Sequence, residues 1–112
     1  MVIPANGSVV LVRFPFSDLS NTKLRPALIL ANAERGDWIL CQITSQPYTD
    51  PNAVEITNSD FASGSLKKTS YARPGKLFTA NAAIMTKHVG SLQDTKLEEI
   101  VRAVILLLEK SI

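Results

Sequence analysis

The strongest constraint on the fold is a series of short apolar runs, rich in β-branched residues and separated by turn-forming residues. Runs of this length and composition favour β-strands over helices. Near the N-terminus they predict three strands, at Ser8–Phe14, Arg25–Ala31 and Trp38–Ser45. Turn formers fill Phe16–Leu24 and Glu34–Asp37 between them, so the three strands are expected to form an antiparallel meander.

The middle of the chain continues this pattern with shorter segments. It predicts further strands at Ala53–Ile56, Ser70–Arg73, Gly75–Thr79 and Lys87–Val89, a loop over Gln46–Asn52, and a turn or single helical turn over Asn58–Gly64. Pro74 is expected to separate two of these strands, because proline cannot donate a backbone hydrogen bond to a sheet ladder.

One segment near the C-terminus has the periodicity of an amphipathic helix. Its apolar residues recur at helical spacing, at Leu97, Ile100, Val101, Val104, Ile105 and Leu108. Thr95 followed by Glu98 fits a capping box at the start of this helix. Leu106 and Leu107 widen its apolar face, which indicates either deep packing or a contact with another subunit.

Together these elements predict a β-rich α+β fold, a small, partly closed antiparallel barrel with a C-terminal helix. The chain has 112 residues, of which 46% are hydrophobic and 20% are charged, which suffices for a core without disulfides or metal. No repeat, linker or low-complexity stretch divides it. Residues 1–112 are therefore expected to form a single domain.

The charge of the chain is only mildly positive, with a formal net charge of +2. This balance permits nucleic-acid binding but does not indicate it. An anionic partner would have to be held by a local cluster of cations. Such a cluster is available at Lys67, Lys68, Arg73 and Lys76.

Two residue types that often carry chemistry occur only once each. Cys41 lies in an apolar run and is expected to be a small buried side chain, and His88 a partly buried strand residue rather than a general base. We therefore expect no metal site and no cofactor, and a pair of catalytic histidines is excluded. There is no signal peptide pattern, and the longest apolar run, Ala103–Leu108, is too short to cross a bilayer. We expect a cytoplasmic protein with no membrane association.

Two polar residues stand out because each lies at one end of an apolar strand. Pro26 is expected at the first residues of its strand, which would leave Arg25 at the rim. Thr44 closes the next strand. An arginine fork matches phosphate oxygens and can stabilise the extra negative charge that a phosphodiester acquires in its transition state. The alternatives are an arginine paired with Asp18 or Asp37, and a threonine with a purely structural role.

These residues are part of a longer pattern that resembles the MazF/PemK (Kid) family of toxin–antitoxin growth inhibitors. The resemblance rests on three segments: Gly7–Asp18, Lys23–Leu30 with its Arg-Pro-Ala motif, and Cys41–Ser45 with its Ile-Thr-Ser strand end. Gly90-Ser91-Leu92 leading into the helix also fits, so the resemblance covers nearly the whole chain.

The resemblance implies an SH3-like barrel that forms a homodimer and cleaves single-stranded RNA (mRNA) at short sequences without metal. A cognate antitoxin would block it. The family's catalytic arginine and threonine fall on Arg25 and Thr44, and its first loop, here Ser17–Leu24, would shape the RNA groove. The expected RNA contacts are Phe16, Ser17, Lys23, Ser45, Gln46, Lys68, Ser70, Tyr71 and Arg73.

The chain departs from the family pattern in two places. Lys23 and Leu24 stand where the MazF branch often has a glutamate, and Lys68-Thr69-Ser70 is the nearest counterpart of an Arg-x-Asp motif of PemK-like members. Phe16 could instead belong to the core. Two other functions stay open at this point, an inactive member that only binds and a toxin of the same fold that poisons gyrase.

Overall fold

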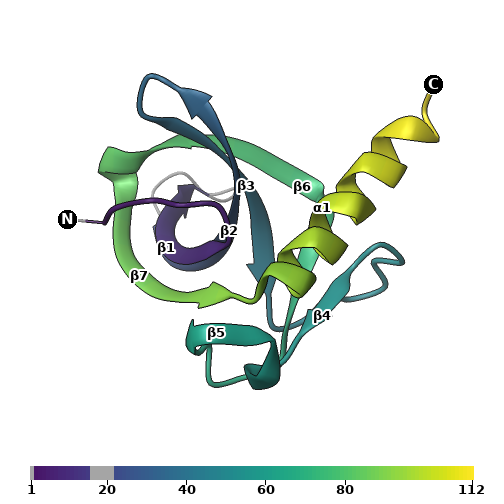
Figure 1. Cartoon of the computed structure of the whole chain (residues 1–112), viewed down its shortest axis with the longest axis horizontal. Helices are drawn as coiled ribbons and strands as arrows, with labels where there is room; N and C mark the ends of the chain where they lie inside the picture. The colour runs from purple at the N-terminus through teal and green to yellow at the C-terminus, as the bar shows by residue number, and fades with distance from the viewer. Residues whose placement is uncertain (1, 16–21) are drawn as a thin grey trace.

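Seven β-strands and one α-helix make up the described part of the chain, residues 2–15 and 22–112 of a computed structural model. The elements are β1 (Ser8–Pro15), β2 (Thr22–Glu34), β3 (Asp37–Thr44), β4 (Val54–Ile56), η1 (Asn58–Asp60), β5 (Phe61–Gly64), β6 (Ser70–Asn81), η2 (Ala82–Ile84), β7 (Met85–Leu92) and α1 (Asp94–Glu109). The strands pair antiparallel in the order β4-β6-β3-β2-β1-β7-β5. The sheet curls into a partly closed barrel (Figure 1), which confirms the predicted fold class.

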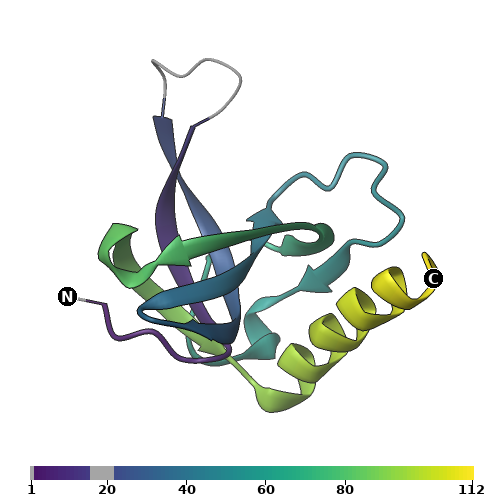
Figure 2. The ribbon, with the colours of Figure 1, turned by 90° about the horizontal axis from the view of Figure 1, so that it is seen from above.

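β1, β2 and β3 form the predicted meander, but β2 is longer at both ends than expected. It begins at Thr22, so Arg25 lies inside the strand, opposite Val12 of β1, and the predicted position at the rim is wrong. Pro26 also lies inside β2. It is tolerated there because the pairing with β3 starts only at Ala27, and the preceding stretch pairs with β1. Figure 2 shows the ends of β1 and β2 projecting from the barrel as a two-stranded ribbon.

The turn between β2 and β3 is a two-residue hairpin where the sequence predicts it. Glu34 pairs with Asp37, and φ is +58° at Arg35 and +83° at Gly36. Positive φ at both central residues marks a type I′ turn, whose twist matches that of the flanking strands. This turn and two bulges in β2, between Ile29 and Ala31 and between Asn32 and Glu34, set the β2–β3 register, and therefore which side chains lie opposite each other.

Two later segments differ from the prediction. Ser70–Asn81 is one strand, β6, although Pro74 predicted two; the proline falls in an interruption of the ladder with β3. Asn58–Gly64, predicted as a turn or a single helical turn, begins with the short helix η1, but its second half is the strand β5, which pairs with β7. The short strands predicted around Ala53–Ile56 and Lys87–Val89 are confirmed as β4 and β7.

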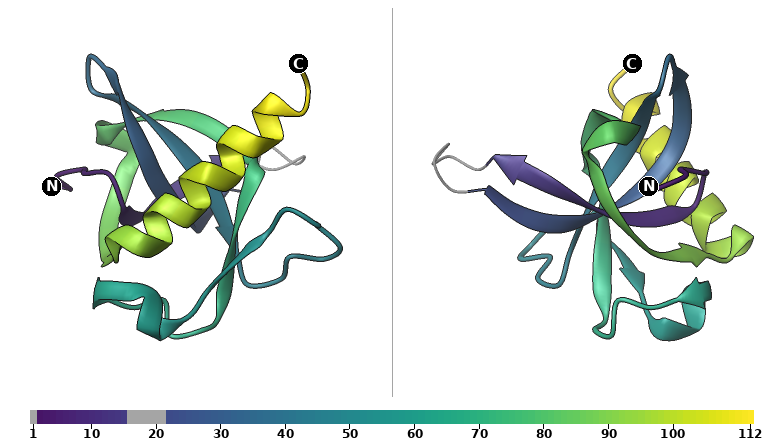
Figure 3. Two further views of the ribbon diagram at one scale, coloured as in Figure 1. Left: turned by 45° about the vertical axis from the view of Figure 1, so that its right-hand side comes forward. Right: turned by 90° about the vertical axis from the view of Figure 1, so that its left-hand side faces the viewer.

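Both faces of the central strands are buried, which explains their nearly continuous apolar runs. α1 lies across one face (Figure 3), and the cluster there includes Val9, Leu28, Cys41, Ile43 and Ile100. The cluster on the opposite face includes Val10, Val12, Ala27, Ile29 and Leu40.

α1 confirms the predicted helix, but its start differs in detail. Gln93 is the N-cap, without a side-chain hydrogen bond, and the helix begins at Asp94. The predicted capping box is therefore wrong, because Thr95 and Glu98 both lie inside the helix. Among the described residues, no helix has the length and apolar character needed to cross a membrane.

Candidate functional site

Arg25 and Thr44 lie on one face of the sheet, on the neighbouring strands β2 and β3. Side chains alternate along a strand, so Arg25 shares its face with Ala27 of β2, and Thr44 shares its face with Gln42 of β3. Ala27 pairs directly with Gln42. The ladder between β2 and β3 ends at this pair, and two residues beyond it on the two strands are Arg25 and Thr44, which line one cavity. The two residues therefore form a polar end of the sheet face on which the apolar Ala27 lies.

β6 approaches this pair through an irregular segment. Its register with β3 shifts between Cys41 and Ile43, so that Gln42 alone faces residues 73–76 of β6. An interruption of this kind bends the strand and redirects its side chains. The segment is fastened to β3 by a hydrogen bond of 3.0 Å from Cys41 Sγ to the carbonyl oxygen of Arg73.

A cavity of about 260 Å³ lies where these strands meet, and we call it the cationic cavity. It is lined by Arg25, Gln42, Ile43, Thr44, Tyr48, Arg73 and Lys76. Within the described residues, no acidic side chain lines it. Three cations around one small cavity suit a phosphate-bearing ligand, although the whole chain is only weakly basic. The structure thus brings the predicted Arg25, Thr44 and Arg73 together.

The Thr44 hydroxyl is held by the backbone of Gln46. Its Oγ1 accepts a hydrogen bond from the amide N of Gln46 and donates one to the carbonyl oxygen, both at 3.1 Å. This turn ends β3 and fixes the orientation of the side chain. To donate to a bound ligand, the hydroxyl hydrogen has only to rotate away from the Gln46 carbonyl, while the heavy atoms stay in place.

Arg73 is fixed by Asp50, which belongs to the loop between β3 and β4. Arg73 Nε donates to Asp50 Oδ2 at 2.8 Å, and the two side chains are 23% and 10% exposed. Asp50 Oδ1 accepts a second hydrogen bond from the amide N of Asn52 at 2.9 Å. The hydrogen bonds from Arg73 and Asn52 lower the pKa of Asp50 below its ordinary value. Asp50 is therefore ionised at neutral pH and forms a largely shielded ion pair.

The single cysteine and the single histidine lie in different environments. Cys41 is a fully buried core residue, as predicted, and burial raises the pKa of its thiol to about 12. His88 lies on β7 with Nε2 3.3 Å from Ser91 Oγ, but it is exposed, so the predicted partial burial is wrong. No group of three or more His, Cys, Asp or Glu side chains in residues 2–15 and 22–112 is placed to hold a metal ion.

Four of the other expected RNA contacts lie near the cationic cavity without lining it. Lys23 is exposed on β2, on the same face as Arg25. Ser45 and Gln46 are exposed and directly follow β3. Tyr71 of β6 is half-buried and pairs across the sheet with the last residue of β3. These positions border the cavity and remain predictions as RNA contacts.

The remaining expected contacts do not reach the cavity. Lys68 is exposed between β5 and β6 and does not line it. Ser70 is only 5% exposed, and its hydroxyl donates to the carbonyl oxygen of Lys68 at 3.1 Å, so a contact of this side chain with RNA is not supported. Phe16 and Ser17 lie outside the described residues.

Sequence reasoning missed two members of this region, Tyr48 and Asp50. Both lie in the loop between β3 and β4, which the sequence predicts only as a connection. Two prolines, Pro47 and Pro51, bracket the pair and restrict the loop, which was the available signal. Gln42 was also missed, although its spacing of two from Thr44 on a strand places both residues on one face.

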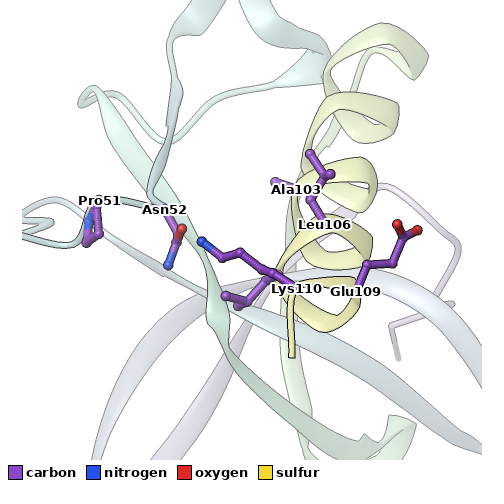
Figure 4. Close-up of a pocket in the computed structure, with 7 residues that line it drawn as sticks. Pro51, Asn52, Ala103, Leu106, Glu109 and Lys110 are labelled. Carbon is purple, nitrogen blue, oxygen red and sulfur yellow. The ribbon is translucent and has the colours of Figure 1, made fainter. Parts of the chain in front are cut away.

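A larger cavity of about 630 Å³ lies between α1 and the same loop (Figure 4). It is lined by Pro51, Asn52, Ala103, Leu106, Leu107, Glu109 and Lys110. Leu106 is 64% exposed, whereas Leu107 is half-buried; Ile105 and Leu108 are also exposed, but they point to other sides of α1. Deep packing within this chain therefore does not explain Leu106.

The sequence was compared with known families and with curated proteins. A family model described as "PemK-like, MazF-like toxin of type II toxin-antitoxin system" matches residues 5–108, nearly the whole chain. The comparison with curated proteins finds no matching sequence.

Solved structures of similar fold include a mycobacterial endoribonuclease in complex with its cognate antitoxin, which is 20% identical with a TM-score of 0.71 over 97% of this chain and 96% of that chain. Another mycobacterial endoribonuclease is 21% identical with a TM-score of 0.72 over 97% and 94% of the two chains. A chain of MazE-MazF from Deinococcus radiodurans is 18% identical with a TM-score of 0.76 over 96% and 98%. At these identities the likeness establishes the fold.

Proposed function

The chain belongs to the PemK-like, MazF-like toxin family of type II toxin–antitoxin systems, and we propose that it is an endoribonuclease that cleaves single-stranded RNA at short specific sequences. The observation that carries the proposal is the cationic cavity, which joins Arg25 and Thr44 with Arg73 and Lys76. Such a cavity fits an RNA strand, in which the scissile phosphodiester has a negatively charged phosphate on either side. Two mycobacterial relatives of the same fold are endoribonucleases, which supports the same activity here.

RNA supplies its own nucleophile, the 2′-hydroxyl. The 2′-oxygen forms a bond to the adjacent phosphorus and loses its proton, while the bond from phosphorus to the 5′-oxygen breaks and that oxygen takes up a proton. The products are a 2′,3′-cyclic phosphate and a 5′-hydroxyl. The protein has to align the attack and stabilise the charge that develops on the phosphate. Both tasks can be done by side chains alone, so we propose metal-independent cleavage.

We assign to Arg25 the role of stabilising the negative charge of the pentacoordinate phosphate. Its planar fork can bind two phosphate oxygens at once, and it stays protonated at neutral pH. Its place inside β2, rather than on a loop, suits a group that must be held rigidly. Arg73, held by Asp50, and Lys76 would bind neighbouring phosphates. Because neither arginine is an effective base at neutral pH, cleavage is expected to be slow.

Thr44 is assigned a hydrogen-bonding role at the same phosphate. Its hydroxyl would turn from the Gln46 carbonyl to a non-bridging oxygen, or relay a proton to the leaving 5′-oxygen. Base recognition is assigned to the bordering side chains. Gln46 and Tyr71 are the described candidates, and unstacked bases are read by such amide and aromatic groups in single-stranded RNA.

The alternative functions, a gyrase-poisoning toxin and an inactive member that only binds, are not favoured. A protein that acts by binding alone has no chemical need for Arg25 and Thr44 in one cavity with two further cations. Catalysis at a phosphodiester accounts for both.

We also propose that the protein works as a homodimer in the cytoplasm and is silenced by a cognate antitoxin. The exposed Leu106 and the half-buried Leu107, which line the cavity beside α1, fit a contact with a second copy across a two-fold axis. Two copies would offer RNA a longer groove than one barrel does. An acidic or amphipathic antitoxin segment that folds on this surface would cover Arg25 and compete with RNA.

The test of the proposed function is cleavage of a long single-stranded RNA by the purified protein in excess EDTA, with the new ends mapped. We expect cuts within a short sequence, leaving 5′-hydroxyl and 2′,3′-cyclic phosphate (or 3′-phosphate) ends. An oligonucleotide with a 2′-deoxy sugar at the scissile nucleotide is the matched control and should stay intact. Strict dependence on Mg²⁺ would contradict the metal-free mechanism, and the absence of any cleavage would leave a function by binding alone.

A further inference from the structure

Tyr48 is an exposed aromatic residue that the fold holds in an unfavourable backbone conformation. Its side chain is 78% exposed, and its φ is +57°, a region that bulky side chains seldom adopt. The loop fixes it from both sides. Before it, the backbone of Gln46 is bound to the Thr44 hydroxyl, and after it, the amide N of Asp50 donates to the carbonyl oxygen of Pro47 at 3.0 Å.

Tyr48 also lies on the border of two cavities. One is the cationic cavity, and the other, of about 340 Å³, is lined by Pro47, Tyr48, Thr49, Asp50, Pro51, Arg73, Gly75 and Lys76. Arg73 and Lys76 line both cavities together with Tyr48. A flat aromatic ring thus stands next to two cations, at the point where the proposed catalytic cavity continues into a second one.

We propose that Tyr48 is a stacking platform for the nucleobase of a nucleotide flanking the scissile phosphate. The base would lie on the tyrosine ring in the second cavity, while Arg73 and Lys76 hold the phosphate of that nucleotide. This inference rests on the proposed function and adds a base-binding subsite to it.

Three physical reasons favour a nucleobase as the ligand. Unpaired bases stack on exposed aromatic side chains, and every base offers a flat face for this. Adjacent cations match the phosphate that each base carries with it. A ring whose backbone is already fixed loses little further freedom on binding, so the strained conformation at Tyr48 is accounted for by preorganisation.

The experiment measures binding of each variant to an RNA that carries the mapped cleavage sequence and a 2′-O-methyl group at the scissile nucleotide, by fluorescence anisotropy. Tyr48→Phe should bind within about twofold of wild type, and Tyr48→Ala and Tyr48→Gly about 10-fold or more weakly, which is the usual scale of base stacking.

Glycine accepts φ +57° without strain, so Tyr48→Gly should be at least as resistant to heat as wild type. Loss of affinity in a stable Tyr48→Gly excludes misfolding as the cause. Ile84→Ala, an exposed apolar residue that lines neither cavity, is the matched control and should bind as wild type.

Abasic substitutions in the same RNA identify the stacked base. In wild type, one flanking abasic position should weaken binding as much as Tyr48→Ala does, and in Tyr48→Ala the same abasic position should have no further effect. Wild-type affinity of Tyr48→Ala, or additive losses at every abasic position, would overturn the subsite while RNA cleavage by wild type stands. If wild type neither binds nor cleaves RNA, the proposed function fails, and the subsite fails with it.

Discussion

Arg73 donates a hydrogen bond from Nε to Oδ2 of Asp50 at 2.8 Å, and this ion pair connects β6 to the loop between β3 and β4. Arg73 lines the cationic cavity, whereas Asp50 does not. The carboxylate lines the adjoining cavity instead, so it holds the guanidinium without placing its own negative charge in the cationic cavity, where the scissile phosphate would bind. This arrangement makes Asp50 a positioning residue in the proposed mechanism.

Asp50→Asn keeps the shape of the side chain and removes its charge. We expect KM for RNA to rise several-fold, on the order of 10-fold, with a smaller fall in kcat, because Arg73 loses its charged partner but stays in place. The free energy of unfolding should fall by about 1–2 kcal/mol, because the pair is largely shielded from water. Steady-state kinetics and urea unfolding measure the two effects. Glu34→Gln, in the distant β2–β3 hairpin, is the control, and a lower KM for Asp50→Asn would contradict the positioning role.

The ion pair between Asp50 and Arg73 also predicts that part of the free energy of unfolding is lost in acid. The pKa of Asp50 is lowered in the folded chain, so its contribution is present above the ordinary value of 3.8 and is lost as the pH falls through the folded value. Unfolding free energies measured on the acid side should decline less steeply for Asp50→Asn than for wild type. Equal slopes for the two proteins would show that Asp50 does not carry this dependence.

Cys41 predicts a loss of stability in alkali. Its pKa is raised from 9.0 to about 12 in the folded chain, so the unfolded thiol releases its proton before the folded one does. The stability that depends on the protonated thiol is complete below pH 9 and is lost as the pH rises towards 12, up to about 4 kcal/mol in total. Urea unfolding between pH 7 and pH 11 should show a steeper decline for wild type than for Cys41→Ala. Parallel declines would contradict the assignment.

Much of this fold follows from the sequence because its signals are local. The Arg35-Gly36 turn, the β-branched run of β1 and the helical periodicity of α1 each act within a few residues. Pro74 shows where local signals stop: it predicts a break in the strand, yet β6 continues through it because the interruption opposite Gln42 tolerates a proline. The exact start of α1 also depends on packing rather than on the Thr95–Glu98 pattern.

The site was predictable only in part, for the same reason. Arg25 and Thr44 could be paired because each lies at one end of an apolar run and a short turn joins the two runs, whereas the two bulges of β2 that fix their register could not be predicted. Asp50 and Arg73 are 23 residues apart in sequence and meet only when the loop after β3 folds against β6. Nothing in the sequence near Asp50 indicates this partner, so the second half of the cavity could not be derived from local patterns.

Thr44 supplies a test of the hydrogen-bonding role. Thr44→Val should lose most of the cleavage activity, about 100-fold, since a hydrogen-bond donor aimed at transition-state charge contributes on that scale. Thr44→Ser keeps the hydroxyl and should retain most of the rate. Single-turnover cleavage of an RNA oligonucleotide gives the rates. Circular dichroism and thermal melts check that Thr44→Val, which also loses the bonds to Gln46, is still folded; a folded Thr44→Val with the wild-type rate would remove Thr44 from the mechanism.

The apolar side of α1 gives a test of assembly. Light scattering at micromolar concentration should give about twice the chain mass of 12.2 kDa for wild type. Leu106→Lys places a charge in the proposed contact and should shift the protein towards the monomer, with weaker RNA binding. Ile84→Lys is the control for an added charge at another exposed apolar position. A monomeric wild type with full nuclease activity would refute the claim that dimerisation builds the RNA groove.

The most direct test of the account is the single-turnover rate of RNA cleavage by wild type, Arg25→Ala and Arg25→Lys in excess EDTA. Arg25 lies inside β2 and lines the cationic cavity. If it stabilises the phosphate charge, Arg25→Ala should be slower by about 100-fold or more, and Arg25→Lys should recover little, because a point charge does not replace the bidentate fork. Wild type should cut in EDTA at the same rate as in Mg²⁺. Cleavage by folded Arg25→Ala at the wild-type rate would contradict the account.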